Sequence, residues 1–118
     1  MEEKVVREIF YYKNYYLRFY EKLKPEVKKK FNWTLKLITV LDRVPVKYLK
    51  HMEGSTGIYE IRVEVGSDIY RAFSFFDKDQ LVIVMNGFQK KTQKTPKNEI
   101  ELAEKLKKEY FNEKEKRK

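Results

Sequence analysis

The sequence predicts a single α+β domain over residues 1–118, in which one small antiparallel sheet carries helices against it. Three observations lead to this fold class. Residues 58–88 contain three consecutive stretches rich in β-branched and aromatic residues, separated by short turns, as in an antiparallel meander. Helical patterns precede and follow this meander. The length of 118 residues fits one domain, and no repeat or linker divides the chain.

The N-terminal part is predicted to form a strand and two helices. Val5–Tyr12 is β-branched and aromatic, which is typical of a strand. Apolar residues then recur every three or four positions up to Leu23, so the first helix is expected to begin near Lys13 or Asn14. Pro25 suits the first turn of a second helix, because its missing N–H would be unpaired there anyway. Pro45 ends this helical region.

The remaining residues are predicted to form three strands and a helix. Residues 59–65 alternate strictly, so Glu60, Arg62 and Glu64 share the polar face of the first of these strands. A turn at 66–68 leads into a strand at 69–76, and the strand at 81–88 is apolar on both faces, which indicates a central position. Residues after Pro96 form the last helix, and the charged end at 113–118 is expected to fray. The predicted order is β-α-α-β-β-β-α, with the two N-terminal helices on one face of the sheet.

The composition excludes several classes of protein. The chain has no cysteine, so it has no disulfide, no thiolate zinc site and no cysteine nucleophile. Its single histidine excludes a metal site built from several histidines. The longest apolar run, Leu81–Met85, is too short to span a bilayer, and the first residues lack the apolar stretch of a signal peptide. We therefore expect a cytoplasmic protein that has no membrane contact.

The charge points to an anionic partner. There are 27 Lys and Arg against 18 Asp and Glu, a net charge of +9. A compact domain with this excess attracts polyanions, nucleic acid first among them, although an acidic protein or an anionic membrane surface fits the same number. The segment Asn86–Asn98 is free of acidic residues and carries Lys90, Lys91, Lys94 and Lys97. Simple solubility is the alternative explanation for these lysines.

Three motifs on consecutive elements resemble one protein family. They are Ile58–Arg62 (IYEIR), Ile69–Phe76 (IYRAFSFF) and Asn86–Pro96 (NGFQKKTQKTP). Together they resemble the phage-derived, HigB-like branch of the RelE/ParE toxin superfamily, whose pattern is LYELR, YRIFYFF and GFxKKTxKTP before a final helix. The resemblance covers residues 45–112 by motif. Ala72 departs from it, since the pattern has the larger aliphatic residue isoleucine there.

The resemblance implies a RelE-like fold and the toxin of a type II toxin–antitoxin system. Most characterised relatives are endoribonucleases that cleave mRNA in the ribosomal A site and so inhibit translation. A helix-turn-helix antitoxin neutralises them, and the family uses no metal and no cofactor. The ParE branch instead inhibits DNA gyrase without nuclease activity, which is the alternative function. A degenerate relative that only binds an antitoxin or nucleic acid is a third possibility.

Metal-free RNA cleavage needs fixed cations near the attacked phosphate. Preorganised positive charge is expected to contribute most, and general acid–base catalysis adds about 10²–10⁴-fold. Arg62 and Arg71 belong to two neighbouring predicted strands and Lys90 follows directly after the third, so we expect them to form one catalytic patch. Arginine suits phosphate because its planar fork donates two hydrogen bonds. Ordinary ion pairs are the alternative, namely Arg62 with Glu60 or Glu64, and Arg71 with Asp68 or Asp77.

The sequence leaves the proton carrier open. Glu60 is a candidate base, or it orients Arg62 by an ion pair, and the RelE branch has a lysine at the matching position. Histidine titrates near neutral pH, and His51 is the only one in the chain. We expect Lys50, His51, Lys91 and Lys94 to bind RNA beside the catalytic patch. Phe73 and Phe75 share the phase of Arg71 and either stack on bases or pack in the core.

Overall fold

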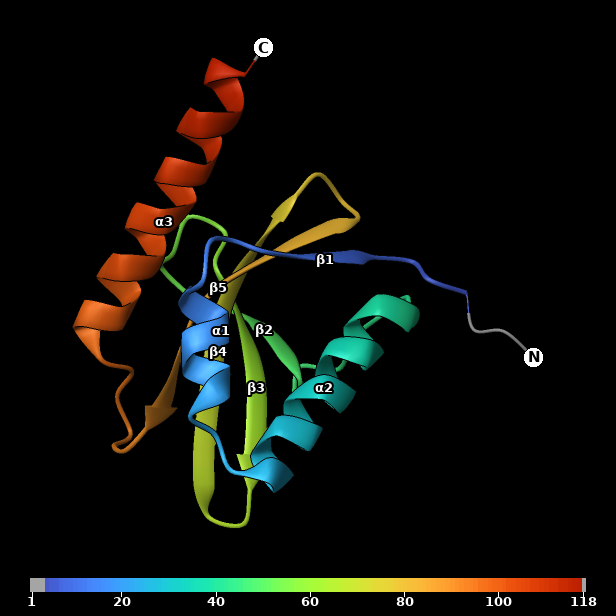
Figure 1. Ribbon diagram of the computed structural model, residues 1–118, viewed down its shortest axis with the longest axis vertical. Helices are drawn as coiled ribbons and strands as arrows, with labels where there is room; N and C mark the ends of the chain where they lie inside the picture. The colour runs from blue at the N-terminus through green and yellow to red at the C-terminus, as the bar shows by residue number, and fades with distance from the viewer. Residues whose placement is uncertain (1–3, 118) are drawn as a thin grey trace.

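The computed structural model describes residues 4–117, which form a five-stranded sheet between two helical layers (Figure 1). In chain order the elements are β1 (Glu8–Tyr11), α1 (Tyr15–Glu21), α2 (Pro25–Val40), β2 (Leu49–His51), β3 (Tyr59–Val65), β4 (Asp68–Asp77), β5 (Leu81–Lys90) and α3 (Lys97–Lys116). The predicted α+β class is confirmed, with each predicted helix and strand present and one strand more.

The sheet has the strand order β1-β5-β4-β3-β2. Strands β3 to β5 are antiparallel, as predicted, and β2 joins β3 antiparallel, whereas β1 pairs parallel with β5. The prediction of a wholly antiparallel sheet is therefore wrong for β1. The residue pattern of a strand does not encode its direction, and the long connection from β1 to β5 allows a parallel pair.

The additional strand is β2, a three-residue edge strand that pairs antiparallel with β3. Three residues are too few to show alternation, so the sequence pattern does not indicate it. Its pairing matters for the site, because it places Lys50 opposite Glu60 and His51 opposite Tyr59.

The sheet buries both faces. On one face, α1 and α2 cover a core cluster that includes Phe31, Ile38, Ile61 and Val84. On the other face, α3 covers a second cluster that includes Phe73, Phe75, Ile83, Met85 and Leu106. This confirms that the two N-terminal helices share one face. Strand β5 lies between β1 and β4 with Val82–Asn86 buried, which confirms its predicted central position.

Helix α1 lies directly against β5 at Gly87. A Cβ atom at this position would overlap the ring of Phe19. Because every other residue type carries that atom, glycine is needed here for the close approach of helix and strand.

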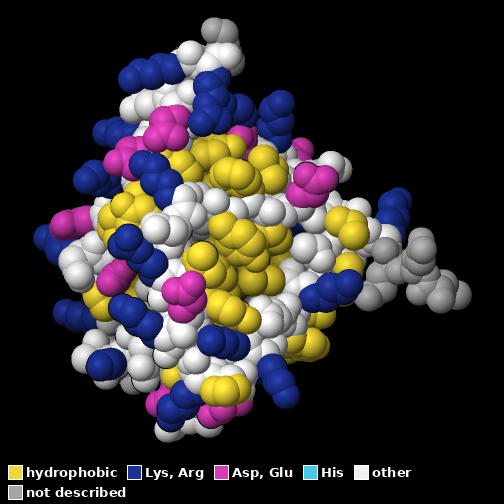
Figure 2. Space-filling model, in the orientation of Figure 1, with side chains coloured by type: hydrophobic (Ala, Val, Ile, Leu, Met, Phe, Trp, Pro, Cys, Tyr) yellow, Lys and Arg dark blue, Asp and Glu magenta, His cyan; other side chains and the backbone are white. Residues whose placement is uncertain are grey.

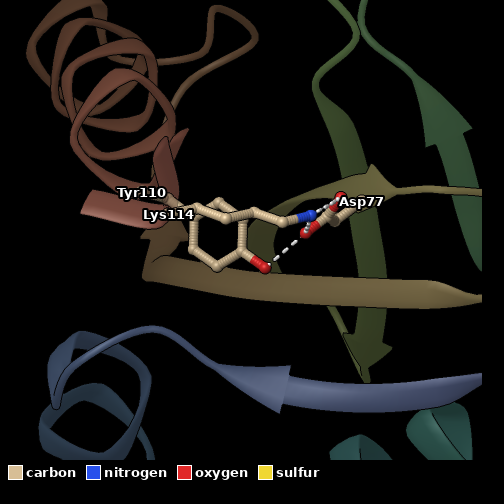
Figure 3. Close-up of polar contacts among 3 residues, drawn as sticks. All are labelled: Asp77, Tyr110 and Lys114. Carbon is tan, nitrogen blue, oxygen red and sulfur yellow. Dashed lines mark hydrogen bonds and ion pairs between the residues drawn. The ribbon is translucent and has the colours of Figure 1, made fainter. Parts of the chain in front are cut away.

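A buried polar cluster holds the C-terminal half of α3 to the end of β4 (Figure 3). Asp77 is only 5% exposed and accepts hydrogen bonds from Tyr110 Oη at 2.5 Å and from Lys114 Nζ at 2.8 and 2.9 Å. Tyr12 adds a hydrogen bond to Glu113 at 2.8 Å. The helix continues to Lys116. Fraying of residues 113–118 stays a prediction, and Lys118 lies outside the described residues.

Candidate nucleic-acid interface

Two arginines face each other on the α3 side of the sheet. Arg62 on β3 is directly opposite Arg71 on β4, and Arg71 is in turn opposite Phe88 on β5. Phe88 belongs to the core cluster under α3, which identifies the face. Like charges directly opposite in a sheet are destabilising. Placement of two arginines there therefore needs a reason other than stability.

Arg71 is almost completely buried, with 2% of its surface exposed. Its Nη1 donates a hydrogen bond to the carbonyl of Tyr70 at 3.0 Å, and its Nε lies 3.9 Å from Glu60 Oε2. Among the described residues 4–117, the Nε atoms of both Arg62 and Arg71 are buried without a hydrogen-bond partner. Buried donors are rarely left unpaired in native proteins. The pair is therefore incompletely compensated, and an anion at Arg62, which reaches the surface, would compensate it.

The charges around Arg71 make its cation costly. Burial lowers the pKa of the Arg71 guanidinium, and the positive charge of Arg62 lowers it further, while Glu60 and Glu64 act in the opposite direction. Arginine nevertheless keeps its proton in proteins. The lowered pKa thus indicates that the surroundings of the Arg71 cation stabilise it incompletely. A bound phosphate would add negative charge and stabilise this cation.

Two predicted lysines lie on the same face as the arginine pair. Lys90 on β5 is opposite Ile69, which alternates in phase with Arg71, so it is a diagonal neighbour of that arginine. Lys50 on β2 is opposite Glu60. Lys91 and Lys94 follow in the exposed loop between β5 and α3. The fold therefore brings Lys50, Glu60, Arg62, Arg71 and Lys90 to one face, with the lysine loop beside them.

His51 does not join this group. It is opposite Tyr59, and its ring packs edge-on against that of Tyr59 at 5.2 Å. Tyr59 in turn packs against Phe76, a residue of the core cluster under α1 and α2. Successive side chains of a strand point to opposite faces, so His51 lies on the other side of the sheet from Arg62 and Arg71. The register therefore separates His51 from the arginine pair, and RNA binding by His51 stays a prediction.

The alternatives left open for Arg71 and its neighbours are also resolved. The carboxylate near Arg71 is Glu60, whereas Asp77 pairs with Lys114 and Asp68 is exposed at the start of β4. Glu60 therefore contacts Arg71, although the sequence suggested an ion pair with Arg62. Phe73 and Phe75 are 0% and 1% exposed. They pack in the core under α3, so the packing interpretation of these rings is correct.

One buried polar residue of the third motif was not singled out from the sequence. Asn86 is 3% exposed, and its Nδ2 donates to the backbone carbonyl and the Oε1 of Glu99 at 3.1 and 3.0 Å. These bonds join the end of β5 to the first turn of α3. The only signal available in the sequence was the position of Asn86 at the start of the NGF segment.

The candidate site has the composition of an anion-binding surface. Within residues 4–117, no group of three or more His, Asp or Glu side chains is placed to hold a metal ion. No helix in this part of the chain combines the length and hydropathy needed to span a membrane. Arg62 is only half-buried and reaches the surface, whereas Arg71 lies in the protein interior. An anion bound at this surface would contact Arg62 and Lys90 directly. The buried charge of Arg71 would attract it through the protein interior.

The chain matches the model of a known protein family, and the match is compatible with its α+β fold and basic sheet face. The model of the family "Phage derived protein Gp49-like (DUF891)" matches residues 18–108, which is more than half of the chain. The chain therefore belongs to the Gp49-like family, which is associated with RelE-like toxins. A search of curated proteins found no match. The family match includes β2 to β5 and all five residues of the sheet-face group.

Proposed function

We propose that this protein is the toxin of a type II toxin–antitoxin pair and that it cleaves mRNA on the ribosome without a metal ion. The observation that carries the proposal is the Arg62–Arg71 pair, placed in register on one sheet face with two buried donors unpaired. Membership of the Gp49-like family and the resemblance to the HigB-like branch support the same function. The ribosomal A site and a neutralising helix-turn-helix antitoxin are parts of the proposal.

In this proposal the RNA supplies its own nucleophile. A base takes the proton of the 2′-hydroxyl as its oxygen attacks the neighbouring phosphorus, the bond to the 5′-oxygen breaks, and that oxygen takes up a proton, which leaves a 2′,3′-cyclic phosphate. Negative charge on the phosphate oxygens grows in the transition state. Arg62 and Lys90 hold those oxygens at the surface, and Arg71 adds positive potential from the interior, where electrostatic interactions are least screened. Removing one such stabilising group costs about 10²–10³-fold in rate.

Glu60 has a positioning role in this proposal. Its carboxylate faces Arg71 and balances part of its charge, so it keeps the guanidinium in place. In the alternative role, as a general base, Glu60 would also take the proton of the 2′-hydroxyl. Glu60→Gln separates the two, because loss of a base changes the pH dependence of cleavage, whereas loss of a positioning contact lowers the rate by a similar factor at every pH.

The test is induction of the chain and its variants in cells, with primer extension on translated mRNA. Arg62→Ala and Arg71→Lys should both lose growth arrest and mRNA cleavage, because neither retains the two arginine forks. Arg18→Ala, which removes an exposed arginine of α1, is the matched control and should remain toxic. Circular dichroism establishes that the variants are folded. Full toxicity of a folded Arg62→Ala variant would refute the site, and DNA-damage signalling without RNA ends would replace the function with gyrase inhibition.

A further inference from the structure

Most of the net positive charge lies in one segment that shares only Lys50 with the proposed site. Residues 22–50 contain nine basic and two acidic residues, a net charge of +7 out of +9 for the whole chain. The other residues contain 18 basic and 16 acidic ones and are nearly neutral. The segment comprises α2, the chain on both sides of it, and the first two residues of β2. In Figure 2, dark blue side chains with yellow ones between them follow the lower right of the molecule, where Figure 1 places α2.

Two aromatic rings lie within this segment, each with a lysine beside it. Trp33 on α2 is 44% exposed, and its ring packs edge-on against that of Tyr48 at 5.3 Å. Lys30 Nζ lies 4.5 Å from the centre of the Trp33 ring, and Lys47 Nζ lies 5.7 Å from the centre of the Tyr48 ring. The order along the surface is thus lysine, tryptophan, tyrosine, lysine. We call these four residues the aromatic–lysine surface.

Packing of the core does not explain Trp33. Helix α2 buries a different stripe, in which Val27, Phe31 and Ile38 are at most 2% exposed. Lys29 and Lys36 stand four positions before and three after Trp33, so they are its neighbours on the helix surface. A large ring surrounded by cations is also unlike the core of a protein–protein interface, from which charged residues are depleted.

We propose that the aromatic–lysine surface is a second RNA-binding site, on which an unpaired base of a structured RNA stacks while the lysines contact its phosphates. Every base offers a π-face to an aromatic side chain, and RNA loops present such unstacked bases. The ammonium of Lys30 is carried on a flexible stem, so it can leave the ring for a phosphate when a base stacks on Trp33. A concentrated charge of this kind binds a polyanion chiefly by releasing its counterions.

The aromatic–lysine surface is connected to the proposed cleavage site through the backbone. The N–H of Arg62 donates a hydrogen bond to the carbonyl of Tyr48 at 2.9 Å. Two residues after Tyr48, Lys50 lies opposite Glu60. One RNA could therefore follow the edge of β2 from the stacking surface to the arginine pair. The inference goes beyond the proposed function, since binding at Trp33 does not depend on any cleavage chemistry.

The chain offers a direct probe, because Trp33 is its only tryptophan. We would titrate the full-length protein, without ribosomes, with an RNA hairpin that has a single-stranded loop, and follow tryptophan fluorescence and the anisotropy of the labelled RNA. Stacking should quench the fluorescence. Trp33→Ala should weaken binding about tenfold or more, as expected for the loss of one stacked base. A blunt RNA duplex without a loop should bind more weakly and leave the fluorescence unchanged.

Phe111→Ala is the matched control, because it removes another exposed ring, on α3, outside the basic segment. It should leave RNA binding unchanged. Equal affinity of Trp33→Ala and the unmodified protein would overturn the proposal, as would equal quenching by polyglutamate, which would mean that the surface binds an acidic protein. Arg71→Lys should still quench normally. The outcome is therefore independent of whether the chain cleaves mRNA.

Discussion

The two ends of strand β4 differ in how well their buried charges are compensated by neighbouring groups. At its C-terminal end, Asp77 is buried and accepts hydrogen bonds from Tyr110 and Lys114, so its charge is balanced (Figure 3). Towards its N-terminal end, Arg71 is equally buried and faces a second arginine across the sheet, and its Nε has only a distant ion pair with Glu60 and no hydrogen-bond partner. The first cluster holds α3 in place. The second is a cost to the fold, and such local violations are expected at functional sites.

The largest expected effect is the separation of activity from stability at Arg71. Arg71→Met should lower mRNA cleavage by about 100-fold or more, because the buried charge is lost. The free energy of unfolding should stay about the same, since Arg71→Met removes a poorly compensated buried charge and its repulsion with Arg62, while Glu60 keeps Lys50 opposite it as a cationic neighbour. Chemical denaturation and primer extension on the same preparations test both halves. A marked loss of stability would show that Arg71 is structural.

The opposite result is expected for Asp77. Asp77→Ala should lower the free energy of unfolding by about 2–3 kcal/mol, because two donors lose a charged acceptor. Cleavage by the remaining folded protein should be unchanged, since Asp77 is distant along β4 from the arginine pair. Urea denaturation gives the stability, and assays well below the midpoint of thermal unfolding give the activity. A loss of cleavage equal to that of Arg71→Met would remove the contrast between the two ends.

Gly87→Ala tests the packing of α1 on the same strand that carries Lys90. The added Cβ would overlap the ring of Phe19, and overpacking of this kind costs about 1–3 kcal/mol. The expected result is a lower midpoint of thermal unfolding. Gly66→Ala is an informative comparison, because a Cβ at Gly66 meets no neighbouring atom although its φ is positive. Equal stability of Gly87→Ala and the unmodified chain would mean that α1 does not approach β5 so closely.

The smallest expected effect is the pH dependence contributed by the Asp77 cluster. Burial alone would raise the pKa of Asp77, but the hydrogen bonds from Lys114 and Tyr110 outweigh it, so this pKa is lowered. Stability from Asp77 is therefore present above the ordinary pKa of about 4 and is lost as the pH falls through the lowered value. Burial and the bond to Asp77 raise the pKa of Tyr110 to about 12. Its contribution is therefore complete below about pH 10 and is lost as the pH rises towards 12.

Tyr110→Phe isolates the alkaline part of this dependence. The variant should lose about 1 kcal/mol at neutral pH, the usual worth of one hydrogen bond. Between pH 10 and 12 its stability should fall less than that of the unmodified chain, because the phenol that ionises is gone. Urea denaturation at several pH values measures this difference. Parallel curves for the two proteins would contradict the role assigned to Tyr110.

The local elements were predictable because their patterns are strong. The alternation in residues 59–65 identified β3 and put Glu60 and Arg62 on one face, as the structure has them. The periodicity of residues 100–110 identified α3, which packs Ala103 and Leu106 on the sheet. The clustering of Arg62, Arg71 and Lys90 also followed from the order of the strands, since neighbouring antiparallel strands place their residues side by side. What failed was too short or too distant in sequence to leave a local signal, namely β2 and the direction of β1.

By itself, the sequence determined the α+β class, the strands that carry the motif residues, the net charge of +9 and the resemblance to a toxin family. These depend on local periodicity, turn residues and composition, all of which can be read along the chain. Only the tertiary structure decided which charges are paired. The burial of Arg71 beside Glu60, the pairing of Asp77 with Lys114, and the contact of Trp33 with Tyr48 join residues that lie 11, 37 and 15 positions apart. Such contacts arise from the packing of whole elements, and no local pattern encodes them.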